Sequence, residues 1–279
     1  MPATIVFSHA NGFPAGTYRV LFDAWRDAGW QVAAVDKFGH DPRYPVSSNW
    51  PKLRDQLIDF IDAEVGGPAW LVGHSLGGLL SLLAACRRPD LAHGLVLLDS
   101  PVIMGWKAHA VQMFKLSGTI GRFSPARVSH KRRVEWASPR EMAQHFAAKS
   151  KFARWDPRVL ADYVASGTVR NGGMTRLAFD REIESHIYNT LPHHLGPLLR
   201  KHPPRCPIGF LAGTRSAEIR VGGLDATRAL VGEHWRWIEG THLFPMERPD
   251  ETASAVLALL SSMPRAPHGE QGPRTTPPV

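Results

Sequence analysis

WLVGHSLGGLLSLLAA, residues 70–85, joins an apolar stretch to a helix-like one through the six residues GHSLGG. Two interpretations compete: a reactive Ser75 on a strained turn, or an ordinary glycine-rich connection. Gly-x-Ser-x-Gly alone is a weak signal, but here it lies between an expected strand and a long apolar helix, the setting of a nucleophile elbow. Because Gly73 and Gly77 lack Cβ atoms, they let strand and helix approach closely around an exposed serine.

Strands and helices alternate on both sides of this turn. The apolar runs predict strands over residues 3–8, 31–35, 69–73, 94–98, 208–212 and 235–238. Helices are expected over about 17–28, 50–65, 76–88, 224–231 and 250–262, between these strands. Strands that are apolar on both faces and alternate with helices indicate an α/β fold, with a mostly parallel sheet of about six strands flanked by helices.

The alternation stops after the fourth strand. Residues 104–205 look helical, so we expect a helical insertion there, within a core formed by residues 1–103 and 206–263. An insertion of that length in a compact fold is usually functional. Residues 264–279 are rich in proline and glycine and poor in apolar residues, which predicts a disordered tail.

The net charge of +8 is concentrated in this insertion. Between Met104 and Arg205 there are 18 Lys and Arg against 7 Asp and Glu, a balance of +11. One interpretation is a solvated basic face, and the other is a surface that attracts an anionic small-molecule substrate. No nucleic-acid-binding module is recognisable, so a nucleic-acid partner is not expected.

Other features of the composition exclude further classes. No run reaches the roughly 18–20 apolar residues that a membrane span needs, and no secretory signal is expected, because the first residues lead directly into an apolar strand. Cys86 and Cys206 lie far apart without metal-ligand spacing, which predicts reduced thiols in a cytoplasmic protein. Neither a metal-ligand cluster nor a Gly-x-Gly-x-x-Gly motif is present, so we expect no metal and no cofactor. No pattern indicates the oligomeric state.

At this point the chain resembles the α/β-hydrolase family, over about residues 4–103 and 206–262. GHSLGG at 73–78 is similar to the family's elbow, SHANGFP at 8–14 to its oxyanion loop, and GTHLFPMERP at 240–249 to its histidine loop. The resemblance implies an α/β-hydrolase fold whose cap is the insertion. Two departures are visible: Ala10 stands where glycine is usual, and the family's first two strands are absent, which predicts six strands and not eight.

A serine hydroxyl needs a base to remove its proton, and His242, after the last strand, is the candidate general base for Ser75. For His9 and His74 we expect loop-stabilising hydrogen bonds. Two carboxylates are candidates for the third member of a triad, Asp99 after the fourth strand and Glu218 after the fifth. The family usually carries aspartate at the position of Ser216, while some relatives take the acid from the end of the preceding strand, where Asp99 lies.

The oxyanion hole is expected to use the N–H of Leu76 and one N–H from the first loop, that of Asn11 or Gly12. The alternative for this pair is a turn-forming Asn-Gly.

These residues point to a serine hydrolase that cleaves a carboxylic ester or thioester through an acyl-enzyme on Ser75. An acyltransferase or a carbon–carbon bond hydrolase would use the same triad. A non-catalytic ligand-binding protein of the same fold is the alternative from another class.

Overall fold

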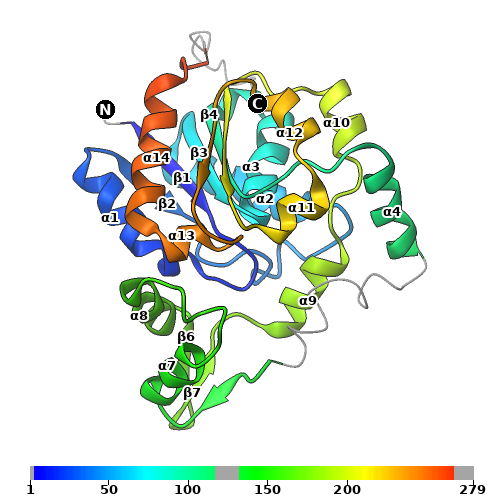
Figure 1. The fold of residues 1–279 in the computed structure, drawn as a ribbon. Helices are drawn as coiled ribbons and strands as arrows, with labels where there is room; N and C mark the ends of the chain where they lie inside the picture. The colour runs from blue at the N-terminus through cyan, green and yellow to red at the C-terminus, as the bar shows by residue number, and fades with distance from the viewer. Residues whose placement is uncertain (1–2, 117–131, 267–279) are drawn as a thin grey trace, which may run out of the picture.

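The computed structural model describes residues 3–116 and 132–266, and its centre is a sheet of six parallel strands (Figure 1). The strand order is β2-β1-β3-β4-β8-β9. The strands are β1 (Thr4–Ser8), β2 (Gln31–Ala34), β3 (Ala69–His74), β4 (Ala92–Leu98), β8 (Ile208–Gly213) and β9 (Trp235–Ile238). This confirms the predicted sheet and all six predicted strand positions.

Helices cover both faces of this sheet because successive strand side chains point to opposite faces. In β1, Ile5 and Phe7 belong to the core beneath α1 and α14, whereas Val6 belongs to the core beneath α2 and α3. The helices of this layer are α1 (Arg19–Asp27), α2 (Pro51–Phe60), α3 (Leu76–Arg87), α11 (Ala217–Gly222), α12 (Asp225–Val231), α13 (Phe244–Glu247) and α14 (Pro249–Ser262). Short helical turns η1 (Ala15–Tyr18), η2 (Ile61–Val65) and η3 (Pro89–Leu91) complete it.

The parallel register aligns the carboxyl ends of neighbouring strands at one edge. Ser8 pairs with Gly73, and His74 pairs with Leu98. Across the next pairs, Leu98 is opposite Leu211 and Gly213 is opposite Ile238. The loops that follow β1, β3, β4, β8 and β9 therefore meet at this edge.

The chain leaves the sheet after β4 and returns at β8, and most of the intervening residues, 104–205, form the inserted segment. It contains α4 (Gly105–Leu116), α7 (Pro139–Ala147), α8 (Pro157–Ser166), α9 (Arg181–Asn189) and α10 (Leu195–Lys201). It also contains an antiparallel sheet of order β5-β7-β6, made of β5 (Glu135–Trp136), β6 (Thr168–Asn171) and β7 (Met174–Leu177). The sequence analysis did not predict these strands, although Asn171-Gly172-Gly173 is a hairpin signal: both glycines have positive φ, as a type I′ turn requires.

The helices of the inserted segment begin where the sequence has capping residues. Ser138 accepts a hydrogen bond from the N–H of Glu141 at 3.1 Å, and Asp156 accepts one from Arg158 at 2.8 Å. Aromatic side chains then join this segment to the loop after β1. The Phe13 ring lies 5.5 Å from that of Trp155 and 5.7 Å from that of Tyr163, so the inserted segment packs beside the edge where the loops meet.

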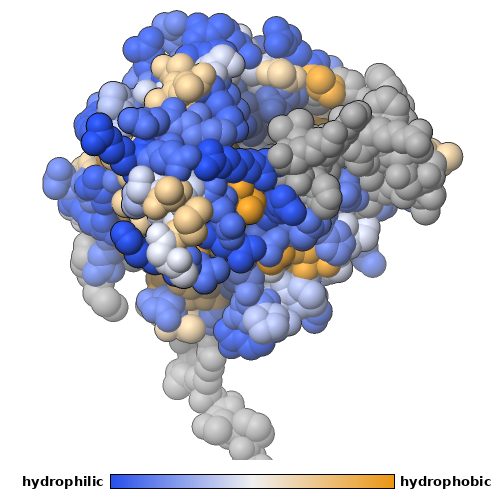
Figure 2. Space-filling model, turned by 90° about the horizontal axis from the view of Figure 1, so that it is seen from below, coloured by the Kyte–Doolittle hydropathy of each residue, from blue (hydrophilic) through white to orange (hydrophobic). Residues whose placement is uncertain are grey.

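The lower face of the molecule, in the view of Figure 2, is mostly hydrophilic where it is described, with small separate groups of apolar residues. None of the helices in the described ranges is both long and apolar enough to cross a bilayer. At the C-terminal end, the N–H of Ala266 donates to the carbonyl of His93 at 3.0 Å. The rest of the predicted tail, residues 267–279, lies outside the described residues.

Candidate active site

The turn between β3 and α3 holds Ser75 in a rare backbone conformation, with φ 55° and ψ −113°. This strained geometry is the expected one for a nucleophile elbow. A Cβ on Gly77 would overlap the carbonyl of Ser8, and one on Gly73 would overlap the backbone of Gly77. The flanking glycines are therefore required because α3 starts directly against β1 and β3.

His242 lies in the loop after β9 and faces Ser75. Its Nε2 is 2.9 Å from the Ser75 hydroxyl oxygen, and its Nδ1 is 2.7 Å from Oδ2 of Asp99. The imidazole is 18 % exposed, so one edge of it is open to the outside. The three side chains form one chain of hydrogen bonds, in the order serine, histidine and carboxylate that a catalytic triad has.

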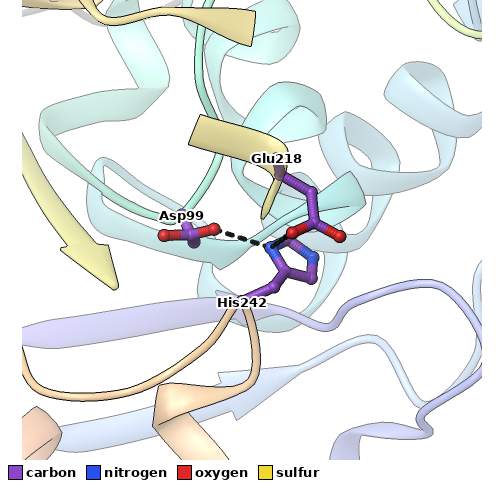
Figure 3. Close-up of side chains that lie close together, drawn as sticks. All are labelled: Asp99, Glu218 and His242. Carbon is purple, nitrogen blue, oxygen red and sulfur yellow. Dashed lines mark hydrogen bonds and ion pairs between the residues drawn. The ribbon is translucent and has the colours of Figure 1, made fainter. Parts of the chain in front are cut away.

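The two predicted acids approach the same nitrogen of His242 from different sides, and Asp99 is the nearer of the two (Figure 3). The Asp99 carboxylate is fully buried and also accepts hydrogen bonds from the N–H of Gly213 at 2.7 Å and from the hydroxyl of Ser216. Glu218 Oε2 is 3.7 Å from Nδ1 of His242, and its side chain is 45 % exposed. Both predicted acids thus reach the same nitrogen, but only Asp99 makes a hydrogen bond to it.

Ser216 is a residue of this site for which the sequence analysis gave no role. It caps α11 by accepting a hydrogen bond from the N–H of Ile219 at 3.2 Å, and it donates to Asp99. The sequence did mark this position, because Ser216 lies three residues after Gly213, where the family that the chain resembles usually has aspartate. The side chain at that position here supports the carboxylate of the neighbouring strand.

His74 is fully buried and ties the histidine loop to the oxyanion loop. The Tyr18 hydroxyl donates to its Nδ1 at 2.7 Å, and its Nε2 donates to the His242 carbonyl at 2.8 Å. The same hydroxyl accepts the N–H of Ala10 at 3.2 Å. Burial holds the pKa of His74 well below its usual value, with a further decrease from His242, so the ring stays neutral and both of its nitrogens stay engaged.

His9 has a comparable structural position, as the sequence predicted for it. Its Nδ1 donates to the carbonyl of Ala10 at 2.8 Å, and its Nε2 accepts the N–H of Phe38 at 2.9 Å. Burial lowers the pKa of His9 to about 4. Both loop histidines are therefore neutral near pH 7 and bind backbone groups.

The oxyanion candidates come from two places, the start of α3 and the loop after β1. Leu76 is the first residue of α3, and Asn11 and Gly12 form the turn that the N–H of Phe13 closes on Ala10. Within the described part of the chain, the N–H groups of Leu76 and Asn11 make no hydrogen bond to another residue. Unoccupied N–H groups beside a serine nucleophile are what an oxyanion hole needs.

The inserted segment contacts the turn at Asn11 and Gly12 through Glu184 of α9. Asn11 Nδ2 donates to the carbonyl of Glu184 in α9 at 2.9 Å. The Glu184 carboxylate lies against Gly12, where a Cβ would overlap it, and pairs with Arg132 at 2.6 Å. No sequence pattern indicated this mostly buried ion pair, because its two members are 52 positions apart (184 − 132) and meet only through the fold.

Asp99, Glu218 and His242 also each place one potential metal-ligand atom within 4.8 Å of the other two. The Asp99 oxygens already accept hydrogen bonds from Gly213, Ser216 and His242, so the cluster is explained as a hydrogen-bonded acid–base group.

A family model described as "Alpha/beta hydrolase family" matches residues 5–255. Monoglyceride lipase of Mus musculus is 34 % identical over 111 residues, covering 37 % of this chain and 36 % of the lipase. A pimeloyl-(acyl-carrier protein) methyl ester esterase of Neisseria meningitidis is 36 % identical over 88 residues, covering 30 % of this chain and 33 % of the esterase. The chain thus matches about a third of the length of each of these two curated relatives.

Solved structures are similar over nearly the whole chain. E-2-(acetamidomethylene)succinate hydrolase has a TM-score of 0.73 at 20 % identity, covering 94 % of this chain and 92 % of that one. The thioesterase domain from the curacin biosynthetic pathway has a TM-score of 0.69 at 17 % identity, covering 92 % and 91 %. At these identities the likeness shows a common fold.

Proposed function

Because the chain belongs to the alpha/beta hydrolase family, we propose that it is a serine hydrolase that cleaves a carboxylic ester or thioester through an acyl-enzyme on Ser75. The observation that carries the proposal is the hydrogen-bonded chain from Ser75 through His242 to Asp99. The names of the curated relatives, a lipase and a methyl ester esterase, agree with ester cleavage.

In the first half-reaction, Ser75 Oγ attacks the acyl carbon while Nε2 of His242 takes the hydroxyl proton. The oxyanion that forms accepts hydrogen bonds from the N–H of Leu76 and that of Asn11, with Gly12 next along the loop. His242 then donates its proton to the leaving oxygen or sulfur, and the bond from that atom to the acyl carbon breaks. In the second half-reaction His242 takes a proton from the water that attacks the acyl carbon, then returns it to Ser75 Oγ as the bond from Oγ to the acyl carbon breaks and the acid is released.

We assign the triad acid to Asp99. Its carboxylate accepts the Nδ1 proton of His242, which fixes the tautomer that leaves Nε2 free to act as a base, and it stabilises the imidazolium. Full burial with two further donors, Gly213 and Ser216, keeps this carboxylate in one orientation. Glu218 contributes only its nearby charge.

The inserted segment is proposed to be the cap of this enzyme. It packs on the loop after β1 through Phe13, and its Glu184 contacts both Asn11 and Gly12 of the proposed oxyanion loop. An element placed there both supports the oxyanion donors and shapes the space above Ser75.

We also propose that the enzyme acts in the cytoplasm. Cys86 and Cys206 are free thiols, the state that a reducing compartment maintains. Alkylation of both thiols in protein taken from cells under acid quench would agree with this location, and a disulfide would contradict it.

The intact mass after exposure to a fluorophosphonate tests the proposed activity, with wild type and Ser75→Ala compared. A single adduct on wild type alone is expected, since only an activated serine reacts readily. Release of acid from esters and thioesters of increasing acyl length then identifies the substrate. Absence of any adduct on folded wild type would contradict the proposal and favour a ligand-binding protein.

A further inference from the structure

A groove of about 370 Å³ opens directly beside His242. Its walls come from three parts of the chain that are far apart in sequence. Lys151 and Arg154 belong to the inserted segment, between α7 and α8, Arg215 and Arg220 follow β8, and the third part is the loop after β9 that carries His242. Four basic residues thus line the same groove as the proposed catalytic base.

The two acidic residues of the groove make their hydrogen bonds and close ion-pair contact with residues other than these four cations. Glu247 is engaged within its own loop, where it accepts the N–H of Thr241 at 2.9 Å and the Thr241 hydroxyl at 2.7 Å. Glu218 is directed at His242, 3.7 Å from Nδ1. Both carboxylates are therefore held on the histidine side of the groove.

Of the four cations, Arg215 has an ion-pair partner, Glu239, at 2.9 Å. Lys151, Arg154 and Arg220 make no ion pair with any residue of the described ranges. Three cations that converge on one groove without carboxylate partners create a positive potential there, which attracts an anion.

Lys151 points from the inserted segment toward the catalytic edge. Its ammonium nitrogen is 5.4 Å from the centre of the Phe13 ring, which is itself buried. The residue has exposed surface, and desolvation lowers the pKa of Lys151 against the opposing charges of Glu184 and Glu218. An anion in the groove would restore the interactions that the ammonium loses there.

The position of the groove beside His242 indicates which part of a substrate would occupy it. In the proposed reaction His242 gives its proton to the departing atom, so the leaving group must lie beside the imidazole. The groove includes His242 but not Ser75 or the oxyanion residues Leu76 and Asn11. It is therefore placed for the leaving group, and the acyl chain must lie elsewhere.

We propose that this cationic groove, defined by Lys151, Arg154, Arg215 and Arg220, binds an anionic substituent, a carboxylate or a phosphate, on the alcohol or thiol leaving group. The inference rests on the proposed function and deepens it by naming the leaving-group class. It also gives a location to the excess of positive charge in the inserted segment, of which Lys151 and Arg154 are a part.

The test uses three butyryl thioesters that share one acyl group. The neutral one is S-butyryl-2-mercaptoethanol, and the anionic ones are S-butyryl-3-mercaptopropionate and S-butyryl-2-mercaptoethyl phosphate. At low salt, kcat/KM is expected to be about tenfold higher or more for an anionic thioester than for the neutral one, since a charge-assisted contact contributes that much. The preference should decrease as salt is added. Whichever anionic thioester has the higher kcat/KM shows whether the groove prefers a carboxylate or a phosphate.

Variants locate the effect. In Arg154→Gln/Arg220→Gln, which keeps Lys151 and Arg215, the ratio of anionic to neutral kcat/KM should fall clearly below its wild-type value. Arg236→Gln removes a matched exposed arginine from β9, outside the groove, and should leave the ratio at its wild-type value. The rate of fluorophosphonate labelling of Ser75 shows that each variant is folded with its triad intact. A ratio near one in wild type, or a ratio that the double variant does not change, overturns the inference.

A binding measurement separates this inference from the proposed function. If wild type is labelled by the fluorophosphonate but cleaves none of the thioesters, calorimetric affinities of Ser75→Ala for the same three compounds replace kcat/KM. If there is no labelling, the proposed function fails, and the same affinities measured on wild type test the groove as a ligand site. Selective binding of an anionic compound that the double variant loses supports the groove, and equal affinities overturn it.

Discussion

The hydroxyl of Ser216 donates a hydrogen bond to the carboxylate of Asp99, so the N-cap residue of α11 supports the acid that directly follows β4. Residues that follow two neighbouring strands therefore fix the position of one carboxylate. The side chain after β8 supplies a donor, and the side chain after β4 supplies the charge that faces His242. This relationship explains how the site keeps an acid at Nδ1 with serine at position 216.

Substitution of the two candidate acids should separate their roles. Asp99→Asn is expected to lower kcat by about 10³-fold to 10⁴-fold, because the amide no longer fixes the tautomer and charge of His242. Glu218→Gln removes a partly exposed charge 3.7 Å away and should cost less than about threefold. Steady-state rates on one ester decide between them, and the opposite order would assign the acid to Glu218.

Ser216→Ala should lower kcat about tenfold, since the loss of a hydrogen bond to a buried carboxylate frees Asp99 to reorient. The same change removes the cap of α11 and should reduce the free energy of unfolding by about 1 kcal/mol. Ser216→Thr keeps a hydroxyl and serves as the control, in which most activity should be retained. Equal losses in both variants would mean that steric fit, and not the hydrogen bond, matters at this position.

Tyr18→Phe should reduce both stability and kcat. It leaves the Nδ1 of His74 and the N–H of Ala10 without their shared partner in a buried place, at a cost of about 1–3 kcal/mol in unfolding free energy. Tyr163→Phe is the matched control, because the buried Tyr163 hydroxyl has no hydrogen-bond partner among the described residues. Urea unfolding gives the free energy of unfolding of both variants, and ester hydrolysis gives their kcat. Equal losses in Tyr18→Phe and Tyr163→Phe would contradict the role of Tyr18.

His9 should make stability depend on pH. Its pKa is about 4 in the folded chain, because of burial, against an ordinary value of 6.5. Between these values the unfolded chain binds a proton that the folded chain does not, so the free energy of unfolding decreases as pH falls from about 6.5 to about 4, by up to about 3 kcal/mol. The slope should be shallower in His9→Gln and unchanged in His109→Gln, whose histidine is exposed. Parallel slopes for wild type and His9→Gln would contradict the assignment.

The sequence predicted the sheet because each strand is a continuous apolar run, and such a run can be buried only where helices cover both faces. Ser75 and His242 were predictable since each lies at a short distance from such a strand. The choice between Asp99 and Glu218 could not be made from sequence. Both follow strands at the same edge, and which of them hydrogen-bonds to Nδ1 depends on the backbone after β4, where Asp99 has a φ of 46°, and on the fold of the loop after β8.

The inserted segment was less predictable. Its capped helices were visible at Ser138 and Asp156, but its three short strands have few apolar residues, and the hairpin signal at Gly172 and Gly173 was overlooked. The cationic groove also has no local signature. Lys151 and Arg220 come together only because the segment folds back over the carboxyl edge of the sheet.

The two strands on either side of the inserted segment, β4 and β8, pair with each other in the sheet, and a hydrogen bond links the residues at their carboxyl ends. Gly213 donates to Oδ1 of Asp99 at 2.7 Å although 114 positions separate the two residues. Because the sheet itself holds β4 and β8 together, the length of the intervening chain has little influence on the position of Asp99, and closure entropy changes only slowly with loop length. Much of this segment can therefore vary in evolution, and with it the specificity, without moving the proposed acid and base at the edge of the sheet.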